Sequence, residues 1–499
     1  MTNLIYNRFF FTFLFLFIIT GSVWGRQPNI VLILTDDQGY ADISLNPQHP
    51  KEVSTPNIDS LAKSGVTFRQ GYISGCVCSP TRAGLMLGRY QQRVGVYTAG
   101  EGGTGFDPKI PIFPDFLPQE YIKTALGKWH LGLDTDFPEL KWSPIHRGFD
   151  ESYGFMGRGG HDYFKLTYSQ TERDTVSNKG KDNENKFVHP LYRGIERIND
   201  EGYLTDRLSD EAVNFIDRNK KRPFFLYLAY NAVHAPAQAP KETITRIKQK
   251  YPELTEERTV LTAMLEHLDK GIGRVIQKLK DENLFDDTLL FFLTDNGGAK
   301  GMFANNAPLR GHKASLYEGG IRTPFIVSYP RKFQAGRVID TPIISLDILP
   351  TVVDVLDTTP SVKPNFDGRS LLPLLEGKKI DKHHETLYWS TGSEGSWAIR
   401  NGDWKLLFQN GNTELFDLKK DTAEKNNLAQ EQPKKVAQLT KLYENWIDSM
   451  SEPLGGGSKY VQNKNQKEIS EEETKQELTL REKKQIERRN QRKIDRLQK

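Results

Sequence analysis

Cysteine is nearly absent from this chain, since only Cys76 and Cys78 occur among its 499 residues. Two cysteines exclude a disulfide scaffold by count, and a bridge between positions two apart would be strained. The ten histidines are scattered, and none pairs with a cysteine at ligand spacing. A structural zinc site is therefore not expected.

Strong charge of one sign and long apolar runs are also missing. The formal net charge is +4, but residues 459–499 hold 13 Lys/Arg against 8 Asp/Glu, so the rest of the chain is close to neutral. A neutral body lacks the basic face that nucleic acid requires, so no nucleic-acid partner is expected. The apolar run at residues 9–19 is well short of the roughly 20 residues that span a bilayer, and no stable membrane insertion is expected.

The N-terminal residues have the layout of a secretory signal peptide. Arg8 precedes the apolar run, and small residues around Gly21 and Gly25 follow it. We expect residues 1–25 to be removed and the mature protein to be exported, to the periplasm or the medium.

The length of the chain predicts one large domain and a smaller one, because single cores stop growing at about 250 to 300 residues. A Pro- and Gly-containing stretch around 360–368 marks the change. We expect a large domain over 26–370 and a small C-terminal α+β subdomain over 371–455. Residues 456–499 are highly charged and are expected to be disordered or to form a lone helix.

Three apolar runs of strand length are each followed by polar residues. Residues 30–34 lead to Asp36, residues 223–228 lead to His234, and residues 289–293 lead to Asp295. Helix-like stretches lie between them, so the chain predicts an α/β fold with a large, mostly parallel sheet sandwiched by helices. The polar clusters should converge beyond the carboxyl ends of the strands. Short alternating segments between 387 and 418 predict a small antiparallel sheet, covered by a helix at about 434–450.

The most specific motif is Cys78-Ser79-Pro80-Thr81-Arg82, which runs on to Gly88-Arg89. An arbitrary cysteine is more often an inert buried thiol. This segment, however, resembles the signature of type I, formylglycine-dependent sulfatases of the alkaline phosphatase superfamily. Residues 124–132, with Lys128 and His130, resemble the second signature of that family. The resemblance covers about 29–418 and points to arylsulfatases, N-acetylgalactosamine-6-sulfatase and exported bacterial carbohydrate sulfatases.

The resemblance implies that a formylglycine-generating maturation enzyme oxidises Cys78 to formylglycine (3-oxoalanine), whose hydrate attacks the sulfur of a sulfate monoester. It also assigns roles to the matching positions. Arg82 would orient the diol and Asp295 would help to generate the nucleophile, while His234 would protonate the leaving oxygen and His130 would assist sulfate release. Lys128 and Lys313 would bind sulfate.

Three carboxylates and one amide follow the first and third strands: Asp36, Asp37, Asp295 and Asn296. Such acids would repel each other without a cation, and all-oxygen donors suit a hard ion such as calcium or magnesium. The resemblance implies one Ca²⁺, bound by these four residues and position 78. With Arg82, Lys128 and Lys313, the site then carries a formal charge of about +2, which would attract a sulfate monoester and stabilise its transition state.

Substrate choice must come from loops outside this core. Arg158, His161 and Asp162 are candidate sugar contacts, although local packing of a surface loop explains them equally well. Export favours a sulfated polysaccharide or its oligosaccharides. A rival is a phosphomonoester or phosphonate hydrolase of the same superfamily, which would use Ser or Thr and usually two zinc ions. A second rival is a non-catalytic glycan binder. The sequence leaves open the sugar and hydroxyl attacked, exo or endo action, the oligomeric state, and the roles of Cys76 and the tail.

Overall fold

The computed structural model describes residues 26–133, 139–157, 160–166, 189–392 and 395–454. The expected signal peptide, Arg158 and the charged tail lie outside the described residues.

The largest element is a ten-stranded mixed sheet with the order β12-β2-β11-β9-β1-β8-β4-β5-β6-β7. The five central strands, from β9 to β5, run parallel. This arrangement confirms the predicted fold class. The strands are β1 (Asn29–Thr35), β2 (Val66–Phe68), β4 (Ile122–Lys128), β5 (Glu151–Phe155), β6 (Leu191–Arg193), β7 (Glu196–Ile198), β8 (Phe224–Ala229), β9 (Thr288–Thr294), β11 (Phe325–Ser328) and β12 (Arg337–Ile339).

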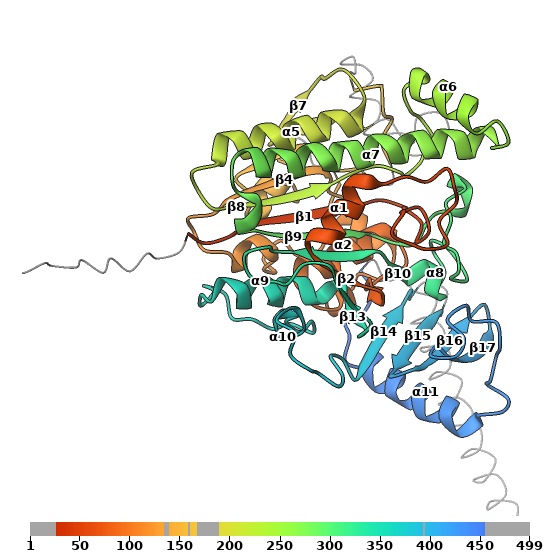
Figure 1. Ribbon diagram of the computed structural model, residues 1–499. Helices are drawn as coiled ribbons and strands as arrows, with labels where there is room; N and C mark the ends of the chain where they lie inside the picture. The colour runs from red at the N-terminus through yellow and green to blue at the C-terminus, as the bar shows by residue number, and fades with distance from the viewer. Residues whose placement is uncertain (1–25, 134–138, 158–159, 167–188, 393–394, 455–499) are drawn as a thin grey trace, which may run out of the picture.

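Helices cover both faces of this sheet, because the side chains of its central strands are apolar on both sides. In β1, Ile30, Leu32 and Leu34 join one core, whereas Val31 and Ile33 join the other. Helices α5 and α7 lie above the sheet in Figure 1, and α9 and α10 lie below it. The helices of this domain are α1 (Pro56–Ser64), α2 (Cys78–Leu87), α3 (Ala99–Thr104), α5 (Leu204–Asn219), α6 (Lys241–Lys250), α7 (Glu256–Asp281), α8 (Glu318–Ile321), α9 (Ile348–Leu356) and α10 (Leu372–Leu375).

A separate antiparallel sheet forms the C-terminal part, as the alternating segments predict. Its order is β14-β15-β16-β17, and α11 packs against it at the lower right of Figure 1. The elements are β14 (Thr386–Ser390), β15 (Trp397–Asn401), β16 (Trp404–Gln409), β17 (Asn412–Asp417) and α11 (Pro433–Ile447).

Two features were not predicted. Strands β3 (Gly71–Tyr72), β10 (Arg322–Thr323) and β13 (Ile343–Ile344) form a third, three-stranded sheet. The glycine-rich stretch at 97–106 forms helix α3, whose start is fixed by a capping box between Thr98 and Glu101. Among the described residues, none of the helices combines the length and apolar character that a membrane crossing needs.

Candidate active site

The parallel strands bring the predicted polar clusters to one edge of the sheet. Thr35 of β1 pairs with Thr294 of β9, so the residues that follow these strands lie side by side. The same edge receives Lys128 at the end of β4 and the segment that follows β8. Parallel strands end at a common edge, which is why residues far apart in sequence meet there.

Cys78 lies in this cluster because helix α2 begins at that residue. The side chain is buried, with Sγ 3.5 Å from Oδ1 of Asp36 and 3.3 Å from Nζ of Lys313. Burial raises the pKa of the thiol to about 12, and the carboxylates of Asp295 and Asp36 contribute to the shift. The unmodified thiol therefore stays protonated at neutral pH and is a poor nucleophile.

Arg82 lies one turn further along α2 and is completely buried. Its Nε and Nη2 donate to Oδ2 of Asp295 at 3.1 and 2.7 Å, and Nη2 also reaches Oδ2 of Asp36 at 3.2 Å. Nη1 donates to the carbonyl of Lys128 at 2.8 Å. Arg82 thus holds three of the strand ends together, and its contact with a modified residue 78 stays a prediction.

The two lysines occupy different environments. Nζ of Lys128 lies 2.5 Å from Oδ2 of Asp36, and both side chains are fully buried. Nζ of Lys313 lies 2.7 Å from Oδ1 of Asp37, and the Lys313 side chain remains 21% exposed. Burial alone would raise the pKa of Asp36, but Lys128, followed by His234 and Arg82, holds it well below its usual range.

The two predicted catalytic histidines are both buried. Nδ1 of His234 lies 2.8 Å from the carbonyl oxygen of Ala235, and Nε2 lies 3.6 Å from Oδ2 of Asp37. Nδ1 of His130 is buried and has no hydrogen-bond partner in the described structure. Burial lowers the pKa of each imidazole, and Lys128 and Arg82 lower that of His130 further.

The donor set fits a hard cation. Asp36, Asp37, Cys78 and His234 each offer a ligand atom, and these atoms lie within 4.8 Å of one another. Oδ1 of Asp295 and Oδ1 of Asn296 are buried without a hydrogen-bond partner among the described residues, although unpartnered buried oxygens are costly. Burial and Asp36 raise the pKa of Asp295 to about 6, as expected where acids crowd together without a metal. The predicted convergence of the polar segments already placed His234 near the aspartates, but its predicted role was that of a proton donor and not that of a metal ligand.

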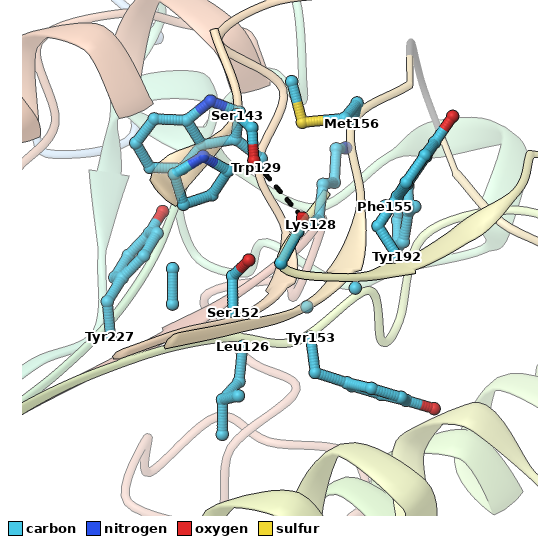
Figure 2. Close-up of a pocket in the computed structure, with 15 residues that line it drawn as sticks. Leu126, Lys128, Trp129, Ser143, Ser152, Tyr153, Phe155, Met156, Tyr192 and Tyr227 are labelled. Atoms are coloured by element: carbon cyan, nitrogen blue, oxygen red, sulfur yellow. Dashed lines mark hydrogen bonds between the residues drawn. The ribbon is translucent and has the colours of Figure 1, made fainter. Parts of the chain in front are cut away.

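Lys128 is held beside a tightly packed part of the sheet. Figure 2 shows Trp129 and Met156 on one side of β4 and β5, and Leu126 and Tyr153 on the other. These residues are among those that line a cavity with a volume of about 20 Å³, room for a single water. Tyr227 of β8 also lines this cavity. Burial raises the pKa of Tyr227, and the nearby charge of Arg82 opposes that shift. No sequence signal marked Tyr227, since it stands within an apolar strand.

Two of the predicted substrate residues, His161 and Asp162, lie in a packed loop, and Arg158 is outside the described residues. His161 is fully buried, with its ring nitrogens beside the carbonyl oxygens of Asp162 and His189. The Asp162 carboxylate accepts hydrogen bonds from the backbone N–H groups of Phe164 and Lys165 and from the Gln238 amide. These contacts favour the local-packing interpretation for His161. A sugar contact by Asp162 stays a prediction.

Fold and site together define an α/β enzyme whose lysines and arginine, paired with aspartates at one edge of the sheet, suit an anionic ester. Comparisons with known proteins identify the family. A family model described as sulfatase matches residues 28–358, and one described as N-sulphoglucosamine sulphohydrolase, C-terminal, matches residues 312–451. The chain belongs to the sulfatase family of the alkaline phosphatase superfamily and is a sulfuric ester hydrolase. Members of this family typically use formylglycine and a metal ion.

Curated relatives and a solved structure cover most of the chain. The uncharacterized sulfatase YdeN of Escherichia coli K12 is 28% identical over 89% of this chain and 90% of its own length. Human N-acetylgalactosamine-6-sulfatase is 31% identical over 72% of this chain and 67% of its own. The crystal structure of Ps i-CgsB in complex with k-i-k-neocarrahexaose is 35% identical, with a TM-score of 0.76 over 86% of this chain and 94% of that one.

Proposed function

We propose that this sulfatase is an exported enzyme that removes sulfate from a sulfated polysaccharide or its oligosaccharides. The observation that carries the reaction is the position of Cys78 at the start of α2, within 3.5 Å of both an aspartate oxygen and a lysine nitrogen of the cluster. The 35% identical structure with a bound neocarrahexaose supports a carbohydrate substrate. The N-terminal apolar run after Arg8 supports export.

Formylglycine at position 78 would supply the hydroxyl that attacks sulfur, and calcium would supply positive charge for the sulfate oxygens. Asp36, Asp37, Asp295 and Asn296, with position 78, would hold the calcium, and His234 borders the same site. Calcium is favoured over zinc because most of these ligand atoms are oxygens.

The remaining side chains act on the substrate. The ammonium of Lys313 lies 3.3 Å from Sγ of Cys78, so it would bind a sulfate oxygen beside the reacting position. Nδ1–H of His234 faces a backbone carbonyl, so the ring must also be protonated at Nε2, beside the Asp37 carboxylate, to deliver a proton to the leaving oxygen. His130 and Lys128 line the buried side, where His130 would assist release of sulfate and Lys128 would bind it.

The test begins with the protein produced together with a formylglycine-generating enzyme. We expect mass spectrometry to find an aldehyde at position 78, and sulfate to be released from an aryl sulfate and from sulfated saccharides. Cys78→Ala should abolish turnover, whereas Cys76→Ala should retain it. Turnover by Cys78→Ala, or faster cleavage of an aryl phosphate than of any sulfate ester, would defeat the proposal.

Metal identity is measured separately. Removal of divalent ions with a chelator should lower both the melting temperature and the turnover, and Ca²⁺ should restore both. Elemental analysis should find about one calcium per chain. A protein that is equally stable and active without calcium would contradict this part of the proposal.

A further inference from the structure

A cavity of about 700 Å³ is lined in part by the segment that leads into Lys313. One wall is the start of α7 and the other is the segment 300–312, which follows β9. This second wall continues directly into Lys313, whose Nζ contacts Asp37 and Cys78. One residue of the cavity lining, His312, therefore directly precedes a lysine that contacts Cys78. The volume of the cavity is within the range of ligand pockets.

The wall of this cavity is firmly attached to the loops of the site. The Oδ1 atom of Asn306 accepts hydrogen bonds from the backbone N–H groups of Gly298 and Tyr40, at 2.9 and 3.2 Å. These two residues closely follow Asn296 and Asp37, respectively.

The Asp42 carboxylate joins the two walls of the cavity. It accepts hydrogen bonds from the backbone N–H of Asn305 and from Arg258 of α7, each at 2.8 Å. The cavity is thus preformed.

Phe303 presents an aromatic ring at this cavity. Its side chain is 47% exposed, and its backbone has a φ of 58°, which is unusual for a bulky residue. Nη1 of Arg258 donates to the Phe303 carbonyl at 3.0 Å and holds this conformation. An exposed aromatic ring kept in a strained backbone conformation suggests a ligand contact.

The charges around the cavity leave the Lys300 ammonium available. Glu253 pairs with Lys51 at 2.6 Å, and Glu52 pairs with Arg258 at 2.8 Å. No ion pair joins Lys300 or His312 to an acid among the described residues, and both side chains line the cavity. An anionic group on the ligand would therefore find its partner at Lys300, and His312, which precedes Lys313 in the chain, offers a polar side chain on the same lining.

We propose that this cavity is a subsite for a second sulfated sugar unit of the glycan, with Phe303 against the sugar face and Lys300 at its sulfate. The proposal rests on the carbohydrate function proposed above and extends it, because the enzyme would then recognise an oligosaccharide or polymer chain and not one sugar alone.

The experiment measures binding, so that it does not depend on turnover. A carrageenan-derived hexasaccharide and disaccharide are titrated calorimetrically into the Cys78→Ala protein. Adding Phe303→Ala or Lys300→Ala should weaken hexasaccharide binding about tenfold and disaccharide binding much less. The Lys300 effect should shrink as salt is raised. Matched controls are Val338→Ala, an exposed apolar residue of β12, and Lys434→Ala, an exposed lysine of α11.

The outcomes separate the two proposals. Equal hexasaccharide affinity in the Phe303 and control variants, or no hexasaccharide binding at all, would overturn the subsite. Phe303-dependent binding by a protein that releases no sulfate from any saccharide would overturn the proposed function and leave the subsite standing.

Discussion

Asp36 is the residue on which most of the charge in the active site converges. Its carboxylate contacts Nζ of Lys128 and Nη2 of Arg82, and Sγ of Cys78 lies beside it. All four side chains are buried, so each charge depends on its partners for compensation. Removing one member of such a set leaves an unpaired buried charge, which costs more than the pair contributes.

The two sulfate-binding lysines should consequently respond differently to mutation. Lys128→Ala leaves Asp36 with less compensation in a fully buried site, so we expect a loss of about 3 to 5 kcal/mol of unfolding free energy together with activity. Lys313→Ala affects a partly exposed side chain. It should lower kcat/KM on an aryl sulfate about 100-fold, with a smaller loss of unfolding free energy than Lys128→Ala causes.

Denaturant unfolding and steady-state kinetics of both variants test this contrast, with Lys434→Ala as the surface control. Equal stability losses in the two lysine variants would contradict it.

At the scale of elements, helix α2 and strand β4 are joined at their ends. Oγ of Ser79 donates to the His130 carbonyl, and Nη1 of Arg82 donates to the Lys128 carbonyl, both at 2.8 Å. His130 has a positive φ of 56°, a conformation that these contacts help to maintain. The two signature segments are thus one structural unit.

Gly127 makes the close approach of β4 to its neighbour possible. Its φ is +100°, and a Cβ there would lie 2.0 Å from the carbonyl oxygen of Ala229 in β8. We expect Gly127→Ala to cost about 2 to 4 kcal/mol of unfolding free energy and to displace Lys128. Gly301→Ala is the matched control, because nothing lies within 4 Å of its added methyl. Similar melting temperatures for the two variants would refute this account of β4.

At the scale of the whole molecule, the C-terminal sheet holds the segment that carries Lys313. The side-chain oxygen of Gln409 accepts from the backbone N–H of Leu316 at 3.0 Å. Lys405 of β16 forms buried ion pairs with Glu318 of α8 at 3.0 Å and with Glu424 at 2.8 Å. The smaller part of the fold therefore positions a residue of the active site.

Because Glu318 and Glu424 share one lysine, Lys405, we expect the stability of the protein to depend on pH. Burial and the neighbouring Glu318 raise the pKa of Glu424 to about 7, from an ordinary value of 4.5. A raised folded-state pKa means that the contribution of Glu424 is complete below about pH 4.5 and is lost as the pH rises through 7. The pKa of Glu318 is about 2, so this residue changes its protonation only under more acidic conditions.

We therefore expect the wild type to lose about 2 to 3 kcal/mol relative to Glu424→Gln between pH 5 and pH 8. Denaturant unfolding of both proteins at several pH values measures this difference. A difference that does not change with pH would show that Glu424 does not carry the shifted pKa.

The sequence by itself determined the nature of the elements and the chemistry of the residues at their ends. A continuous apolar run such as 30–34 is removed from water on all its side chains only in a strand that is buried on both faces. Such runs therefore predicted central parallel strands, and with them the edge of the sheet where the aspartates meet. The segment around Cys78 indicated the family, because the residues of this motif are contiguous in the sequence. The bounds of α11 were also predicted closely, and the span predicted for the C-terminal sheet, 387–418, nearly coincides with that of its four strands.

Only the tertiary structure decided the surroundings of each side chain. Lys128 and Lys313 are chemically identical, but different segments pack over them. The Lys128 side chain is completely buried against Asp36, whereas that of Lys313 is 21% exposed. His161 became a packed residue, and His234 came within reach of the metal ligands. Burial and charge pairing are set by segments that are distant in sequence, such as Asp36 and Lys128 across 92 positions, and no local pattern records them.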